Sequence, residues 1–144
     1  MKRILNLFAI ALFLNLNTFA DQKEIITFVQ LPQAAQDVVS QNFSQSDISY
    51  VTKERGWSVE YEVRFTNGTE IEFDTDGALK KIDCKGNPIP EALLPAEVVT
   101  YVKTNFPGAS IKEWGTDDGE YEAELNNGLK LKFDNSYRFK RIDN

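Results

Sequence analysis

The stretch WSVEYEVRFTNGTEIEFDTDGALKKID, residues 57–83, decides the fold, because its apolar and polar residues alternate strictly between recognisable turns. A period of two is typical of a strand with one buried face and one solvent-exposed face. Residues 119–143, GEYEAELNNGLKLKFDNSYRFKRID, follow the same pattern at an offset of 60. A match of this length predicts that the chain contains the same antiparallel meander twice.

The register of each hairpin follows from the same alternation. A two-residue loop would place apolar residues opposite charged ones and mix the two faces of the sheet. A three-residue loop, Thr66–Gly68, instead pairs Val63 with Ile71 and puts its glycine at the left-handed position that this loop requires. In the second copy the same rule places Glu122 opposite Lys132 on the solvent-exposed face.

A short amphipathic helix is predicted before each meander. In the first copy the apolar residues fall at helical spacing after Pro32, a residue that suits the first turn of a helix. This stripe comprises Leu31, Ala34, Ala35, Val38 and Val39. The second copy repeats the stripe after Pro95, at an offset of 63, and ends before Pro107-Gly108.

The sequence therefore predicts an α+β fold built from a tandem repeat, residues 31–83 and 94–143, in which each unit is one helix followed by a four-stranded antiparallel meander. We expect the two units to form one continuous curved sheet with both helices on one face. The linker Lys85–Leu93 contains Gly86, Pro88 and Pro90 and joins the units. The domain is expected to span residues 21–144.

Residues 1–20 have the layout of a secretory signal peptide. Lys2 and Arg3 precede the apolar stretch Ile4–Leu16, and cleavage is expected between Ala20 and Asp21. The stretch is shorter than the roughly 20 residues that a membrane-spanning helix needs. We therefore predict a periplasmic or secreted protein with no membrane attachment after cleavage.

Composition argues against several classes of function. The chain after residue 20 has 14 basic and 22 acidic residues, a net charge of −8, and it has no basic stripe for nucleic acid or an anionic membrane. It contains no histidine, which removes the commonest general base, so we expect no enzymatic activity. Cys84 is the only cysteine and is expected to be a small, partly buried apolar side chain.

The solvent-exposed face of the sheet is the candidate binding surface. Glu60, Glu62 and Arg64 alternate along one strand of this face and are its candidate contacts for a protein partner, whose identity the sequence does not reveal. Trp57 and Trp114 do not align between the copies, so one of them is expected at a rim where a partner could contact it.

Asp74 and Asp76 are the candidate metal ligands, and calcium is the one cofactor considered. The segment Asp74-Thr75-Asp76-Gly77 resembles the opening of a calcium loop, but Lys85 stands where the closing glutamate would be. The competing interpretation is a hairpin turn that Asp74 caps. In the second copy Tyr137 replaces Gly77, which predicts a strained residue or a different loop there.

Several motifs together resemble the PepSY-like, β-lactamase-inhibitor-like proteins exported by Bacteroidetes. These motifs are Phe73-Asp74-x-Asp76-Gly77, Ile82-Asp83-Cys84, Tyr101-Val102-Lys103-x-Asn105-Phe106-Pro107-Gly108-Ala109 and Asn127-Gly128-Leu129. The resemblance implies a fold like that of β-lactamase inhibitory protein, with two helix-plus-four-strand units and a concave sheet, and a periplasmic or secreted location. It implies no activity. Because some members are described as calcium-regulated, it also adds modest support to the calcium interpretation of Asp74 and Asp76.

Overall fold

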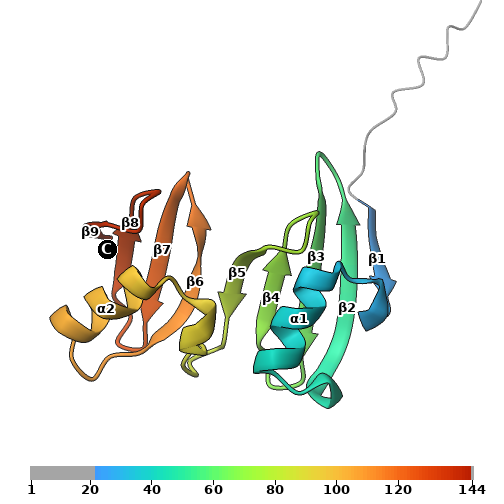
Figure 1. The fold of residues 1–144 in the computed structure, drawn as a ribbon, viewed down its shortest axis with the longest axis horizontal. Coiled ribbons are helices and arrows are strands. Elements are labelled where there is room, and N and C mark those ends of the chain that lie inside the picture. The colour runs from blue at the N-terminus through green and yellow to red at the C-terminus, as the bar shows by residue number, and fades with distance from the viewer. Residues whose placement is uncertain (1–21, 144) are drawn as a thin grey trace, which may run out of the picture.

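A computed structural model describes residues 22–143 (Figure 1). Within this range the chain forms two α-helices and nine strands, and the strands make one antiparallel sheet in sequence order, β1 to β9. The helices are α1 (Gln33–Asn42) and α2 (Ala96–Asn105). The strands are β1 (Gln22–Ile26), β2 (Ile48–Arg55), β3 (Val59–Phe65), β4 (Glu70–Phe73), β5 (Leu79–Asp83), β6 (Ile111–Asp117), β7 (Glu120–Leu125), β8 (Lys130–Phe133) and β9 (Phe139–Asp143).

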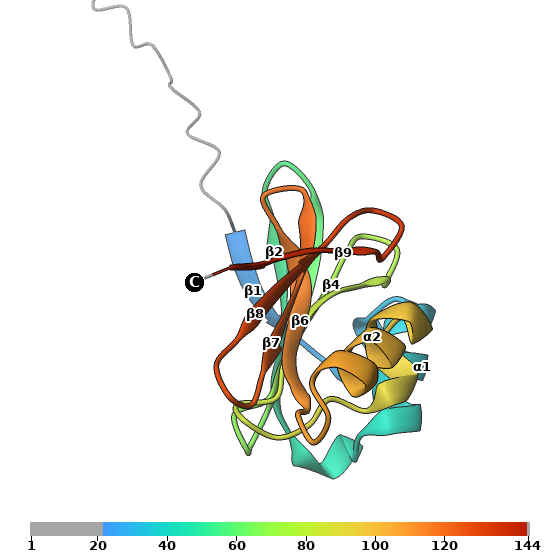
Figure 2. The ribbon, with the colours of Figure 1, turned by 90° about the vertical axis from the view of Figure 1, so that its left-hand side faces the viewer.

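Both helices lie on the same face of the sheet, as Figure 2 shows. α1 is followed by β2 to β5, and α2 is followed by β6 to β9. The predicted α+β class and the single sheet are therefore confirmed. The predicted strand count was wrong by one, because β1 precedes the first unit and pairs with β2.

The predicted hairpin registers are confirmed. Val63 pairs with Ile71 and Glu122 pairs with Lys132. The Phe65 amide donates to the Thr69 carbonyl at 2.9 Å, which closes the three-residue loop, and Gly68 at its end has a φ of 90°. Alternation in the sequence was sufficient here because a register error of one residue would have turned every apolar side chain toward solvent.

The hydrophobic core lies between the helices and the inward face of the sheet. Ala35 and Val39 of α1 are fully buried, and Val98 and Val102 of α2 occupy the corresponding positions in the second half. The sheet contributes one inward residue at every second position, including Val63, Phe65, Ile71, Phe73, Ile82, Ala123, Leu125, Leu131 and Phe133. This burial of apolar area is the main source of stability in a domain without a disulfide.

Trp57 departs from the predicted pattern. The alternation assigned it to the buried stripe of the strand, but β3 begins at Val59 and Trp57 is fully exposed in the β2–β3 turn. Trp114 is buried in β6 and stacks on Tyr121 with a ring-centroid distance of 5.2 Å. Of the two tryptophans, Trp57 is therefore the one available to a partner.

The β4–β5 and β8–β9 hairpins use the same turn with different residues. The Gly77 amide donates to the Asp74 carbonyl at 3.0 Å, and the Tyr137 amide donates to the Asp134 carbonyl at 2.9 Å. Gly77 has a φ of 85° and Tyr137 a φ of 59°. The second hairpin therefore keeps the loop and places a tyrosine in the left-handed region, which is the strained alternative predicted from the sequence.

The predicted signal peptide, residues 1–20, lies outside the described residues. Over residues 22–143 neither helix has both the length and the apolar character needed to cross a bilayer.

Candidate functional site

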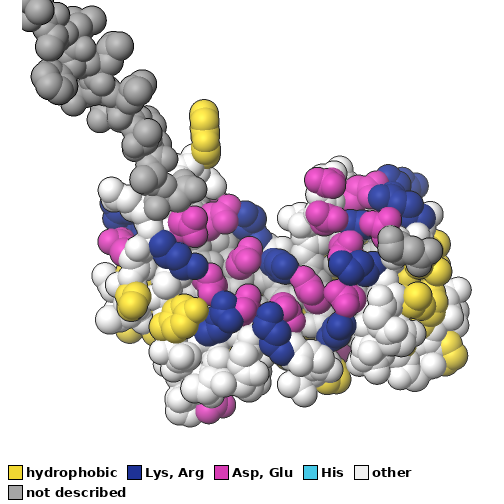
Figure 3. Space-filling view, turned by 180° about the vertical axis from the view of Figure 1, so that it is seen from behind, with side chains coloured by type: hydrophobic (Ala, Val, Ile, Leu, Met, Phe, Trp, Pro, Cys, Tyr) yellow, Lys and Arg dark blue, Asp and Glu magenta, His cyan; other side chains and the backbone are white. Residues whose placement is uncertain are grey.

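The candidate site is the face of the sheet that carries no helix, here called the polar face. Figure 3 views the molecule from the side opposite to Figure 1, so that this face is toward the viewer, and shows acidic and basic side chains intermixed across it. The register places the following charged residues on it: Lys23, Glu54, Glu60, Glu62, Arg64, Glu70, Glu72, Lys81, Asp83, Glu113, Asp117, Glu120, Glu122, Glu124, Lys130 and Lys132. Alternation in the strands puts them all on one side, because their neighbours face the core.

The three residues predicted to contact a partner alternate along β3 on the polar face; Glu62 and Arg64 share one ionic network, and Glu60 pairs separately with Lys80. Arg64 Nη2 lies 3.4 Å from Glu62 Oε1, and the other Arg64 terminal nitrogen pairs with Glu70. Glu62 Oε2 in turn accepts a hydrogen bond from Lys23 Nζ at 2.7 Å. Burial raises the pKa of Glu62, but the hydrogen bonds from Lys23 and Arg64 outweigh it and hold that pKa below its usual range.

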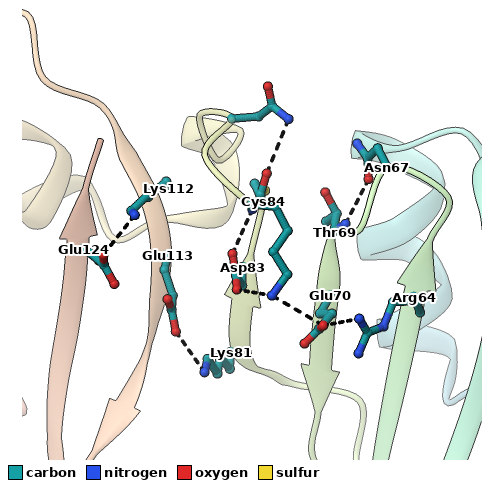
Figure 4. Close-up of polar contacts among 12 residues, drawn as sticks. Arg64, Asn67, Thr69, Glu70, Lys81, Asp83, Cys84, Lys112, Glu113 and Glu124 are labelled. Atoms are coloured by element: carbon teal, nitrogen blue, oxygen red, sulfur yellow. Dashed lines mark hydrogen bonds and ion pairs between the residues drawn. The ribbon is translucent and has the colours of Figure 1, made fainter. Parts of the chain in front are cut away.

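An ion pair also crosses the boundary between the two halves of the sheet, and others lie beside it (Figure 4). Lys81 of β5 contacts Glu113 of β6 at 2.8 Å. Lys85 lies 2.6 Å from Asp83 and 3.4 Å from Glu70. These ion pairs therefore link charged side chains of the polar face on and beside the β5–β6 boundary. Each exposed pair adds little to stability.

Lys132 is the most deeply buried charged group of the polar face. Its side chain is 2% exposed, and its Nζ lies 2.7 Å from Glu122 and also contacts Asp117. Burial lowers the pKa of Lys132, but the hydrogen bonds to Asp117 and Glu122 reverse this effect and raise it. This ammonium is therefore charged and enclosed by carboxylates.

At Glu120 the arrangement is reversed, because two cations, Lys140 and Arg141, contact one carboxylate. Hydrogen bonds from Arg141 and Lys140 lower the pKa of Glu120 to about 2. Glu120 therefore stays ionised throughout the physiological pH range, and its ionic contacts persist with it.

Among the described residues, three hollows lie on the polar face or at its edge beside the β2–β3 turn. The first has a volume of about 100 Å³, is called the acidic hollow below, and is lined by Thr52, Glu54, Glu60, Tyr61, Glu62 and Glu72. The second, of about 230 Å³, adjoins it at the β2–β3 turn and is lined by Glu54, Gly56, Trp57, Ser58 and Glu60. The third, of about 240 Å³, lies in the second half and is lined by Lys81, Glu113, Gly115, Thr116, Asp117, Glu122 and Lys130.

Asp74 and Asp76, the predicted metal ligands, lie in the β4–β5 turn. Asp74 Oδ1 accepts hydrogen bonds from the amides of Asp76 and Ala78, both at 2.9 Å, so it caps the turn. Asp134 caps the second turn in the same way, although Ser136 there replaces the second acid. Within residues 22–143 no cluster of three acidic, histidine or cysteine side chains has the geometry to hold a metal ion.

Cys84 is buried and offers no reactive thiol. Burial raises the pKa of its thiol, and this outweighs the opposing effect of a hydrogen bond with Thr69. A thiol with a raised pKa is a poor nucleophile at neutral pH.

The sequence analysis did not predict the position of Lys23, the burial of Lys132 or the acidic hollow. Lys23 was missed because β1 was not predicted. Lys132 was predicted to lie on the solvent-exposed face, and nothing in the sequence indicated that its neighbours would bury it. The hollow left a detectable signal, because the alignment of the two copies places Glu72 against Lys132, a reversal of charge at equivalent positions.

Comparison with known proteins finds one matching family. A family model described as "Putative beta-lactamase-inhibitor-like, PepSY-like" matches residues 18–60 and 59–141. No curated protein matches the chain.

Three crystal structures resemble the fold described above. A "putative periplasmic protein from DUF2874 family" of Bacteroides vulgatus is 36% identical, with a TM-score of 0.81 over 87% of this chain and 99% of that one. A "putative calcium-regulated periplasmic protein" of Bacteroides thetaiotaomicron is 38% identical, with a TM-score of 0.78 over 85% and 97% of the two chains. A further "putative periplasmic protein of unknown function" from Bacteroides vulgatus is 28% identical, with a TM-score of 0.77 over 85% and 100%.

Proposed function

The chain belongs to the PepSY-like, β-lactamase-inhibitor-like family, and from this premise we propose that it is a non-enzymatic module that binds or inhibits a protein partner through its polar face. It is a periplasmic protein, as are the three similar structures by their descriptions, and this agrees with the location predicted from the sequence. The partner is therefore expected among periplasmic or exported proteins.

The observation that carries the proposal is that, over residues 22–143, no helix covers one face of the sheet. Both helices cover the opposite face (Figure 2), and charged side chains of the polar face are joined by ion pairs such as Lys81–Glu113 and Lys132–Glu122. Fixed charges favour specific recognition, since a partner with the complementary pattern need not order them on binding. Charge patterns of this kind govern the rate and selectivity of association more than its raw affinity.

The non-enzymatic part of the proposal is supported by the chemistry of the side chains. The chain has no histidine, and its one cysteine has a raised pKa. Glu120 is paired with Lys140 and Arg141, and its pKa of about 2 keeps it ionised rather than poised to exchange a proton near neutral pH.

We also propose that the two halves are copies of one unit and that the sheet curves to make the polar face concave. The order of one helix and four strands occurs twice, and the register pairs Val63 with Ile71 as it pairs Ala123 with Leu131. A concave face would let a convex loop of the partner contact both halves at once.

Charge reversal on β3 tests this proposal. The mature protein with Glu60→Lys, Glu62→Lys and Arg64→Glu is immobilised beside wild type, and proteins retained from a periplasmic extract are identified by mass spectrometry. We expect a wild-type partner whose retention falls at least tenfold with the triple variant, because reversed charges repel a complementary surface.

The matched control reverses three charges on the helical side, with Asp37→Lys, Glu97→Lys and Lys103→Glu. It changes the net charge by the same amount, so a general effect of charge would reduce retention equally in both variants. Retention that is the same for wild type, the β3 variant and the control would exclude the polar face as the binding surface.

A second candidate function is calcium-dependent regulation through Asp74 and Asp76. It is supported by the description of the Bacteroides thetaiotaomicron relative and by the two acids in the β4–β5 turn. The competing role of Asp74 is to cap the turn, which Asp134 performs in the second half without a second acid.

Calorimetry with calcium chloride separates these two roles. If the turn binds calcium, wild type should give a saturable heat with a Kd of roughly 10⁻⁴–10⁻³ M, and Asp76→Ala should abolish it. Asp118→Ala removes one acid from another turn and should leave that heat unchanged. The absence of heat from wild type at millimolar calcium would end this candidate.

A further inference from the structure

We propose that the acidic hollow of the first half binds a lysine or arginine side chain of the protein partner. This inference rests on the proposed function and names the chemistry that the polar face would recognise. It comes from a comparison of equivalent positions in the two halves of the sheet.

The strand register defines which positions are equivalent. Glu62 of β3 lies between Thr52 of β2 and Glu72 of β4. In the second half Glu122 of β7 lies between Gly115 of β6 and Lys132 of β8. Two residues along the strands, on the same face, Glu60 pairs with Glu54 as Glu120 pairs with Asp117.

The second half contains its own ammonium at this place. Lys132 Nζ lies between Glu122 and Asp117, and its side chain is almost completely buried. These two carboxylates are the equivalents of Glu62 and Glu54. The pattern of acids that the two halves share is therefore one that, in this chain, encloses a lysine.

In the first half the enclosed ammonium is missing. Glu72 occupies the position of Lys132, so a third carboxylate stands where the cation would be. Lys23 pairs with Glu62 and Lys80 pairs with Glu60, but within residues 22–143 no ion pair reaches Glu54 or Glu72. Four carboxylates thus line the acidic hollow, and of these the three cations that pair with them, Lys23, Arg64 and Lys80, contact only Glu62 and Glu60. Complementary charge for Glu54 and Glu72 would have to come from outside.

The size and shape of the acidic hollow favour an organic cation. About 100 Å³ exceeds the roughly 30 Å³ of one water molecule and suits the end of a lysine or arginine side chain. A metal ion is disfavoured because the carboxylates of the described chain do not converge on a common point. The neighbouring hollow leads from Glu54 and Glu60 to the exposed ring of Trp57, which can cover the apolar stem of such a side chain.

Blocked tripeptides provide the probes, with lysine, arginine or glutamine between two glycines. Each is titrated into the ¹⁵N-labelled mature protein while the backbone amides around the acidic hollow and the Trp57 indole N–H are followed by NMR. We expect saturable, millimolar binding of the lysine and arginine peptides, with shifts confined to this region, and no saturable shift with glutamine.

Three variants sharpen the assignment. Glu72→Lys installs the ammonium of the second half and should abolish binding, and Glu72→Gln should weaken it about fivefold, which covers a failure of the first variant to fold. Lys23→Ala removes one of the two cations that pair with Glu62 and should strengthen binding about two- to fivefold. Glu97→Lys on α2 makes the same change in net charge as Glu72→Lys and should leave binding unchanged.

Several results would overturn the inference. It fails if no lysine or arginine peptide gives a saturable shift, if Glu72→Lys or Glu72→Gln binds as wild type does, or if calcium chloride alone shifts the same amides. If the protein with reversed β3 charges no longer retains a partner from the extract while the Glu72→Lys variant still retains it, the proposed function stands. The acidic hollow is then not the lysine or arginine site of that function.

Discussion

Replacement of Gly77 by alanine is expected to destabilise the protein by about 3 kcal/mol or more, which lowers the melting midpoint by roughly 10–15 °C. Gly77 has a φ of 85°, where an L side chain costs about 1–2 kcal/mol. A Cβ at this position would lie 2.8 Å from Pro32 Cβ and 2.9 Å from the backbone nitrogen of Ala35. Because one of these contacts is backbone of α1, the helix itself would have to move away from the β4–β5 turn, and overpacking of this kind adds about 1–3 kcal/mol.

Gly128→Ala is the matched control for this variant. Gly128 has a φ of 87°, but a Cβ there would meet no atom within 4 Å, so the substitution carries only the backbone cost of about 1–2 kcal/mol. Chemical denaturation of both variants at one temperature gives the comparison. Equal losses of stability in the two variants would mean that α1 does not press on the β4–β5 turn.

The equivalent turn in the second half shows why a glycine is not required there. Tyr137 accepts the left-handed conformation because its ring packs on Tyr121 at a centroid distance of 4.9 Å and approaches Trp114 at 6.3 Å. From the sequence alone, Tyr137→Gly would be expected to relieve strain and stabilise the protein. The aromatic contacts reverse the sign, since their loss together with the buried ring area outweighs the relief, and a net loss of about 1 kcal/mol is expected.

The registers of the sheet could be predicted because they depend on a local rule. Val63 opposite Ile71 and Glu122 opposite Lys132 follow from alternation and a three-residue loop, whereas a two-residue loop would have placed apolar residues opposite charged ones. The same reasoning identified the polar face and its candidate contacts Glu60, Glu62 and Arg64. Their role in binding stays a prediction.

Features that depend on the neighbours in space could not be predicted in this way. β1 has the sequence Gln-Lys-Glu-Ile-Ile and is almost wholly exposed, so it has no alternation to reveal it and exists only because β2 offers an edge. Trp57 continued the apolar alternation but falls in a turn. Alignment of the two copies pairs Glu72 with Lys132, but the acidic hollow itself could not be seen until the strands placed Glu54, Glu60, Glu62 and Glu72 around it.

Neither half of the sheet is expected to fold without the other. β5 and β6 join through three residue pairs, and one of them brings together Ile82 and Trp114, both buried. The Cys84 amide also donates to the Lys112 carbonyl of the second half at 2.9 Å. Separation would expose these apolar side chains and leave β5 and β6 as open edges, which favour aggregation.

Size reinforces this expectation, since a unit of about 60 residues buries only about 60% of its unfolded surface and is marginal without a disulfide or metal. Residues 21–86 and 87–144 should each be collapsed or insoluble, and a mixture should recover the amide spectrum of the intact protein. As a control, a protease site between Gly86 and Asn87, cleaved after folding, should leave the spectrum unchanged because the β5–β6 pairing is already formed. A dispersed spectrum with a cooperative melting transition from either fragment alone would show that each half is an independent domain, and the shared polar face would then lose its structural basis.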